Sequence, residues 1–249
     1  MKRWLLVPLS LLMVLAVLGV VGCQSKPKKL VVGTSADYEP FEYVDENGSY
    51  TGFDIELMEE IGKRMGVEIE WQDIAFDGLI GALQSGKIDA IIAAMSATPE
   101  REEQVDFTKP YFIGADAIIV AEGSGITITK NEDMAGLRVG VQSGTIQEQW
   151  IDENIDADVQ HYERAEQAIL DLKSGRIDVV AMDYYAAQNF IEQGGIEMAL
   201  KTEFAGEHMA IAVKEGNTEL RDQLNEIIDE LQAEGFVDNL AMKYLGGGE

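Results

Sequence analysis

The chain has 249 residues, of which 46% are hydrophobic and 26% are charged, so it has a globular composition with room for one large domain or two smaller ones. Its 45 Asp and Glu residues outnumber 19 Lys and Arg residues, and the formal net charge of −26 excludes a nucleic-acid-binding function. One cysteine cannot form an internal disulfide. With two histidines and no recognisable metal motif, the sequence predicts no metal centre and no cofactor, although carboxylates could still bind a cation.

The N-terminus is typical of an export signal. Met1–Arg3 is cationic, and an apolar run from Trp4 to Val21 follows it. The run approaches the ~20 residues that span a bilayer, so a retained transmembrane helix is one alternative, and a plain soluble export signal is another. A small residue directly before Cys23 resembles a bacterial lipobox, in which the cysteine is lipidated. We therefore expect a lipoprotein signal peptide over residues 1–22 and a flexible tether over 23–29.

An internal duplication indicates two lobes of similar α/β plan. Leu83–Asp89 recurs as Leu172–Asp178, and each copy is followed by an apolar run. A helix that ends at a glycine and leads into a buried strand explains both copies. The alternation of strands and helices predicts mixed, mostly parallel sheets, whose ligands bind at the carboxyl ends of the strands.

Lobe 1 is expected over residues 30–117, with an amphipathic helix at about 53–65 after a turn at Asn47-Gly48. Lobe 2 is expected over 118–206. The tail, 207–249, predicts one strand over Met209–Val213 and two helices, which should pack back on lobe 1. Two chain crossings, near 115–121 and 205–210, would then form a hinge.

The segment Ser96–Arg101 predicts a short helix whose first turn carries a cation. Thr98 is a typical N-cap, and Pro99 suits the first helical position. A cation there opposes the helix dipole, so the position makes sense if Arg101 helps to bind an anion. The alternative is an ordinary surface arginine paired with a nearby acid.

Two segments of the second lobe offer further polar groups. Gly140–Thr145 leads from a strand through a glycine turn into a helix, where backbone N–H groups can meet an anion, although a plain helix cap gives the same pattern. Asp183 closes the apolar strand Ile177–Ala181, where an ionised group needs a partner, although it could equally cap the next helix.

Two aromatic residues fall in predicted loops at the same edge. Core packing is the commoner fate of such side chains, but Tyr38 and Phe76 could also face the cleft. An arginine for an anion, an aspartate for a cation and aromatic rings between them describe a pocket for a zwitterion. We therefore predict a free α-amino acid as the ligand.

Motifs spread over the chain give a more specific indication. They are Gly33–Phe41, Gly52–Leu57, Gly86–Asp89, Thr98–Arg101, Val105–Thr108, Gly140–Thr145 and Gly175–Asp178. With these motifs, the chain from Leu30 to Leu245 resembles the bacterial solute-binding family 3, the polar amino-acid-binding proteins of ABC importers. The resemblance implies an α/β, periplasmic-binding-protein-like fold of type II, with two lobes on a two-strand hinge that close over the ligand.

The resemblance also implies roles for individual residues. Arg101 would bind the α-carboxylate with Thr145 and the backbone of Ser96, and Asp183 would bind the α-ammonium with Ser96 and the backbone of Ala94. The ligand side chain would lie among Tyr38, Phe76, Gln142, Asp54 and Met182. Many relatives carry an acid where this chain has Ser35. Here the acid stands two residues later, at Asp37, and both residues are candidates for the pocket.

The segments around Phe76 and Gln142 look more like those of arginine binders than of histidine binders. Arginine or another basic amino acid is therefore the expected ligand, with glutamine as its rival. The implied partners are the free L-amino acid and an ABC permease in the cytoplasmic membrane, with a monomeric protein held outside the cytoplasm by lipidated Cys23.

Two other classes of function remain as alternatives. One is a cyclohexadienyl (prephenate or arogenate) dehydratase on the same fold, which needs a general acid in the cleft. The other is a sensor that reports its ligand to a membrane receptor. Because none of the motif residues demands chemistry, we predict no enzymatic activity.

Overall fold

The structure is a computed structural model, and it describes residues 28–204, 206 and 208–246. The expected signal peptide and the lipidation site at Cys23 lie outside the described residues, so both stay predictions. None of the helices in the described part combines the length and the apolar character that a bilayer span requires.

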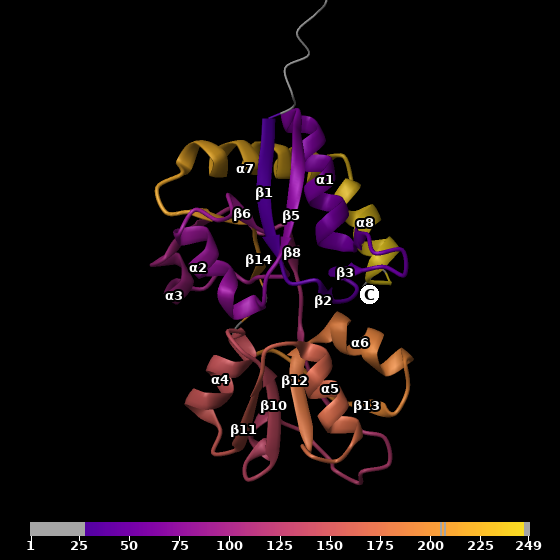
Figure 1. The fold of residues 1–249 in the computed structure, drawn as a ribbon. Helices are drawn as coiled ribbons and strands as arrows, with labels where there is room; N and C mark the ends of the chain where they lie inside the picture. The colour runs from indigo at the N-terminus through magenta and orange to yellow at the C-terminus, as the bar shows by residue number, and fades with distance from the viewer. Residues whose placement is uncertain (1–27, 205, 207, 247–249) are drawn as a thin grey trace, which may run out of the picture.

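One half of the molecule, called the first lobe below, is built on a five-stranded sheet in the order β5–β1–β6–β15–β7 (Figure 1). The strand bounds are β1 Lys28–Thr34, β5 Val67–Asp73, β6 Ala90–Ile91, β7 Val105–Phe107 and β15 Ala212–Lys214. A smaller sheet contains β2 Asp37–Tyr38, β3 Glu42–Val44 and β4 Tyr50–Thr51. The helices are α1 Phe53–Met65, α2 Leu79–Gln84, α3 Pro99–Glu102, α7 Thr218–Ala233 and α8 Phe236–Tyr244, with a 3₁₀ turn, η1, at Phe76–Gly78.

The other half, the second lobe, is built on the sheet β11–β10–β12–β9–β13. Its strands are β9 Asp116–Ala121, β10 Arg138–Gln142, β11 Asp158–Tyr162, β12 Val179–Asp183 and β13 Ile196–Thr202. Its helices are α4 Ile146–Asn154, α5 Ala165–Lys173 and α6 Tyr184–Glu192, with a 3₁₀ turn, η2, at Asn131–Met134.

The two sheets share one plan, as the duplication predicts. In each sheet the second strand, β1 or β10, is parallel to both neighbours, and the fourth strand, β15 or β9, is antiparallel to both of its neighbours. The helix before β6 and the helix before β12 both end next to a left-handed glycine, Gly86 at φ 73° and Gly175 at φ 72°. In each sheet four strands therefore run in one direction, and a single strand next to a chain crossing, β15 or β9, runs in the other.

Helix α1 begins and ends where the sequence predicts. Acidic residues stand in its first turn and basic residues in its last turn, which suits the helix dipole, and Gly66 ends it in the left-handed conformation. Its apolar face, with Ile55, Met58 and Ile61, is buried, and the helix packs beside α7 and α8. The tail thus returns to the first lobe, as expected.

The chain passes between the lobes twice. Strand β8 (Phe112–Ile113) pairs antiparallel with β14 (His208–Met209), and the expected strand Met209–Val213 is divided between β14 and β15. The first crossing precedes the expected position, because Asp116–Ala121 belongs entirely to β9 of the second sheet. The exact lobe boundaries stay predictions.

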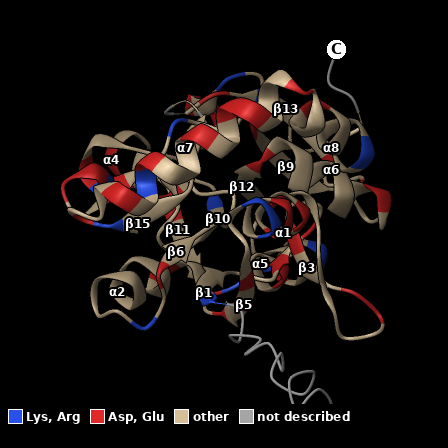
Figure 2. Ribbon diagram, turned by 90° about the horizontal axis from the view of Figure 1, so that it is seen from above, with Lys and Arg blue, Asp and Glu red and all other residues tan. Residues whose placement is uncertain are grey.

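Acidic residues are distributed over many elements, among them α1, α4 and α7 (Figure 2). Because the charges stand on many separate elements, the net charge by itself does not define a ligand-binding surface.

Gly52 fixes the backbone where α1 begins beside Phe41. Its φ is +126°, and a Cβ atom at this position would lie 2.2 Å from the carbonyl oxygen of Phe41. Residue 52 therefore has to be a glycine for the chain to keep this backbone path.

The substitution Gly52→Ala should lower the apparent free energy of unfolding by about 2–4 kcal/mol. Gly81, within α2, has open space around it. The control Gly81→Ala should change stability by less than about 1 kcal/mol, in the stabilising direction. Urea unfolding compares the two, and equal stabilities would contradict this account of Gly52.

Candidate ligand-binding site

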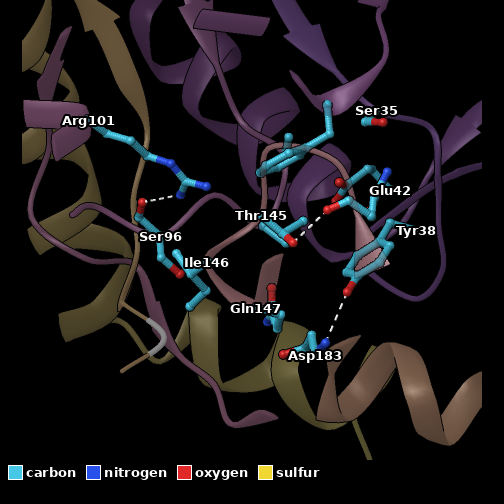
Figure 3. A pocket seen from close by; sticks show the side chains of 13 residues that line it. Ser35, Tyr38, Glu42, Ser96, Arg101, Thr145, Ile146, Gln147 and Asp183 are labelled. Carbon is cyan, nitrogen blue, oxygen red and sulfur yellow. Dashed lines mark hydrogen bonds between the residues drawn. The ribbon is translucent and has the colours of Figure 1, made fainter. Parts of the chain in front are cut away.

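A cleft between the two lobes collects most of the predicted site residues (Figure 3). The first lobe lines it with Ser35, Tyr38, Glu42, Phe76, Ala93, Ala94, Ser96 and Arg101. The second lobe contributes Gln142, Thr145, Ile146, Gln147 and Asp183. The cleft lies beyond the carboxyl ends of β1, β10 and β12, the edge that the sequence predicts for a ligand.

Arg101 is a buried cation that joins the two lobes. Thr98 caps α3 by accepting a hydrogen bond from the backbone N–H of Arg101, and Pro99 occupies the first helical position, as predicted. The guanidinium donates to the carbonyl oxygen of Ser96 at 2.6 Å and to that of Gly144, in the second lobe, at 2.8 Å. Its Cζ lies 5.5 Å from the centre of the Phe76 ring. With 8% of its surface exposed, Arg101 is therefore no ordinary surface arginine.

Asp183 combines the two roles that the sequence left open. One oxygen, Oδ1, caps α6 by accepting from the backbone N–H groups of Tyr185 and Ala186 at 2.7 and 3.0 Å. The other oxygen, Oδ2, is buried and has no hydrogen-bond partner among the described residues. Burial raises the pKa of Asp183 to about 7. A cation in the cleft would satisfy the second oxygen and favour the ionised form.

Glu42 is a pocket residue that the sequence interpretation missed. Strand β3 carries it opposite Tyr38, and only 1% of its surface is exposed. Burial, followed by the nearby charge of Asp54, raises the pKa of Glu42 well above its ordinary value. The register of β2 and β3 is the signal that could have found it, because directly opposed residues share one face of a sheet.

Asp54 stands behind the pocket rather than among its lining residues. Its Oδ2 accepts from the backbone N–H of Ala94 at 2.6 Å and from the hydroxyl of Tyr111 at 2.8 Å. Burial raises the pKa of Asp54 to about 7, and the hydrogen bonds from Ala94 and Tyr111 oppose that rise. Asp54 thus fixes the backbone of Ala94, which has a φ of 45°.

The remaining predicted residues divide into two groups. Ser35, Ala94, Ser96, Gln142 and Thr145 line the cleft, as do both predicted aromatic residues. The hydroxyl of Tyr38 accepts from the backbone N–H of Asp183 at 3.0 Å. Met182 lies in the core of the second lobe and borders a small adjoining cavity. Asp37 contacts the second lobe outside the cleft.

Within the described part of the chain, a cluster of possible metal ligands lies outside the cleft. Glu148, Asp152 and His161 place one ligand atom each within 4.8 Å of one another on the second lobe. Glu148 is already engaged there, because it bonds Nδ1 of His161 at 2.7 Å and accepts from the backbone N–H of Gly144 at 2.5 Å.

Comparison with known proteins agrees with this arrangement. Residues 30–247 match the bacterial extracellular solute-binding proteins, family 3, and the chain belongs to that family. It is 40% identical to a probable histidine-binding protein of Campylobacter jejuni, over 86% of this chain and 84% of that protein. It is 35% identical to the arginine-binding extracellular protein ArtP of Bacillus subtilis, over 99% of each chain.

A solved structure gives the same result for the fold. An ancestral arginine-binding protein bound to arginine superposes with a TM-score of 0.82 at 40% identity, covering 87% of this chain and 97% of that one. The predicted type II periplasmic-binding-protein fold is thus confirmed. The chain is a solute-binding protein, not an enzyme, and its family places it outside the cytoplasm.

The buried carboxyls make the ligand-free protein sensitive to pH. Because burial raises the pKa of Asp54 and Asp183 from 3.8 to about 7, the folded state binds protons between these values that the unfolded state has released. The stability of the ligand-free protein should therefore fall as the pH rises from about 5 to 8. Asp183→Asn should reduce this fall, measured as the thermal midpoint after any copurified ligand has been removed by unfolding and refolding.

Asp178→Asn is the matched control for this prediction. The hydrogen bond to Arg138 lowers the pKa of Asp178, so its contribution to stability changes only below its ordinary pKa. The control should leave the slope between pH 5 and 8 unchanged. A ligand-free protein whose stability is flat or rises over this range would contradict the account.

Proposed function

We propose that the chain captures a basic L-amino acid, arginine first, and delivers it to an ABC permease in the cytoplasmic membrane. The sequence around Cys23 supports attachment of the protein, which we propose is a monomer, to the membrane through a lipidated cysteine. The family and the cleft between the lobes support the capture of a small solute.

The charge pattern of the cleft carries the proposal. Among the described lining residues, Arg101 is the cation, and Glu42 and Asp183 are the acids, with Asp54 buried directly behind Glu42. A ligand with one carboxylate and two cationic groups matches this set. A neutral zwitterion offers a single cation and leaves more of the buried acid uncompensated. Basic amino acids have the required charges, and the planar guanidinium of arginine also suits a site that aromatic rings line.

The same pattern explains how one ligand couples the lobes. Arg101 belongs to the first lobe and Asp183 to the second. An α-carboxylate held by Arg101 and an α-ammonium held by Asp183 would therefore bridge them. Ligand binding then favours closure, because the ligand gains its full set of contacts only in the closed arrangement.

A thermal-shift panel of the twenty L-amino acids with ornithine, citrulline and prephenate tests the proposal on residues 24–249. A ligand at about 1,000 times its Kd should add about 4 kcal/mol, which corresponds to a shift on the order of 10 °C. We expect the largest shifts with arginine and other basic amino acids. A large shift with glutamine alone would replace the basic ligand by a neutral one, and no shift with any amino acid would contradict the proposal.

Arg101→Ala tests the carboxylate site. Loss of the guanidinium should weaken binding on the order of 100-fold or more, because it leaves the ligand carboxylate desolvated and unmatched. The control is Arg176→Ala, whose side chain is 74% exposed and pairs with Asp171. Calorimetric titration should find the control unchanged, and circular dichroism should show both variants folded. Wild-type affinity in Arg101→Ala would remove this residue from the site.

Glu42→Gln tests the choice of ligand class. It removes an acid from the pocket while keeping the size of the side chain, so the preference for arginine over glutamine should fall by about tenfold. Glu46→Gln, in the exposed turn between β3 and β4, is the control. Competition titrations that give the same preference for Glu42→Gln and the wild type would show that Glu42 does not select the charge of the ligand.

A further inference from the structure

An ion-pair cluster joins the lobes beside the cleft. Asp37, at the start of β2 in the first lobe, accepts a hydrogen bond from Nη1 of Arg164 at 3.0 Å. Its second oxygen accepts from the backbone N–H of Ala165, the first residue of α5, also at 3.0 Å. One carboxylate of the first lobe thus binds both a guanidinium and a helix N-terminus of the second lobe.

Two further groups of the first lobe converge on Arg164. Its Nη1 lies 3.2 Å from Oγ of Ser35 and 3.1 Å from Oδ1 of Asp73, at the end of β5. Asp73 also accepts from the backbone N–H of Ala36 at 3.1 Å. The side chains of Asp37 and Arg164 are 10% and 25% exposed. Partial burial and several shared partners distinguish this interlobe cluster from an isolated surface ion pair, which contributes little.

The interlobe cluster and the pocket share one short segment. Ser35 and Tyr38 line the cleft, while Asp37, between them in the sequence, is held by the second lobe. The hydroxyl of Tyr38 meets the backbone N–H of Asp183 in the second lobe. The contacts that hold Asp37 against α5 therefore also help to hold its sequence neighbours Ser35 and Tyr38 at the pocket.

We propose that Asp37 and Arg164 are positioning residues that stabilise the closed cleft and slow the release of its ligand. The attraction acts between lobes, so it is lost when they separate. If the Arg164 guanidinium were removed, the carboxylates of Asp37 and Asp73 would face α5 with no cation between them. The effect on ligand release rests on the proposed function, whereas the effect on closure of the lobes does not depend on it.

Stopped-flow kinetics with L-arginine test the effect on release. Arg164→Gln should raise the dissociation rate constant about tenfold and leave the association rate constant within about threefold, because the cluster forms only on closure. Arg164→Lys keeps the charge and should restore part of the slow release. The matched control is Arg138→Gln, since Arg138 pairs with Asp178 at 2.6 Å within the second lobe. It should leave both rate constants unchanged.

A double-mutant cycle tests whether the two residues act on each other. Asp37→Asn with Arg164→Gln should release ligand no faster than Arg164→Gln alone. Asp73→Asn, at the more exposed end of the cluster, serves if an Arg164 variant does not fold, and it should raise the dissociation rate constant in the same direction. Additive effects in the cycle, or an unchanged dissociation rate constant in Arg164→Gln, would overturn the inference.

A distance measurement separates this inference from the proposed function. Residues 24–249 contain no cysteine, so Lys87→Cys and Lys173→Cys, both exposed, can carry one spin label on each lobe. Arg164→Gln should deplete the short-distance population relative to the wild type, with or without ligand. If the wild type binds no amino acid, the proposed function fails, and the distance populations alone decide the inference. Identical populations in Arg164→Gln and the wild type would overturn it.

Discussion

A buried guanidinium that has to be matched joins the two lobes. Arg101 is almost fully buried, and it donates to a carbonyl oxygen of each lobe. Buried carboxyls, Glu42 and Asp183, line the same cleft. Removing charges from water is costly unless partners meet them with good geometry, so the protein has to hold these groups until a ligand of complementary charge completes the set. The hinge lets the two lobes open for the ligand, and closure places the buried charges of both lobes around it.

The repeated plan of the sheets supplies the geometry. Each lobe directs the carboxyl ends of its parallel strands at the other lobe, so short loops can hold polar groups on rigid supports (Figure 1). Asp183 serves both the fold and the pocket, because one carboxylate oxygen caps α6 and the other is left for a ligand. Asp54 supports the pocket from behind, because it fixes the backbone of Ala94.

Much of this arrangement could be predicted from the sequence, because local signals carry it. The N-cap Thr98 and the N1 residue Pro99 place Arg101, and the duplicated glycine stops reveal the two lobes. What escaped prediction depends on contacts between distant segments. Glu42 lines the pocket because β3 registers against β2, and nothing in its own neighbourhood marks it as buried. Asp37 was expected at the ligand, but it meets Arg164, which is 127 residues away and in the other lobe.

Calorimetric titration with L-arginine and with agmatine, its decarboxylated counterpart, tests the central claim most directly. Agmatine keeps the guanidinium and an ammonium but has no carboxylate for Arg101. If Arg101 binds the α-carboxylate of the ligand, L-arginine should bind, and agmatine, which offers Arg101 no carboxylate, should bind more weakly on the order of 100-fold or more. Equal affinity for the two compounds would contradict the account, because the ligand would then be held by its cations alone.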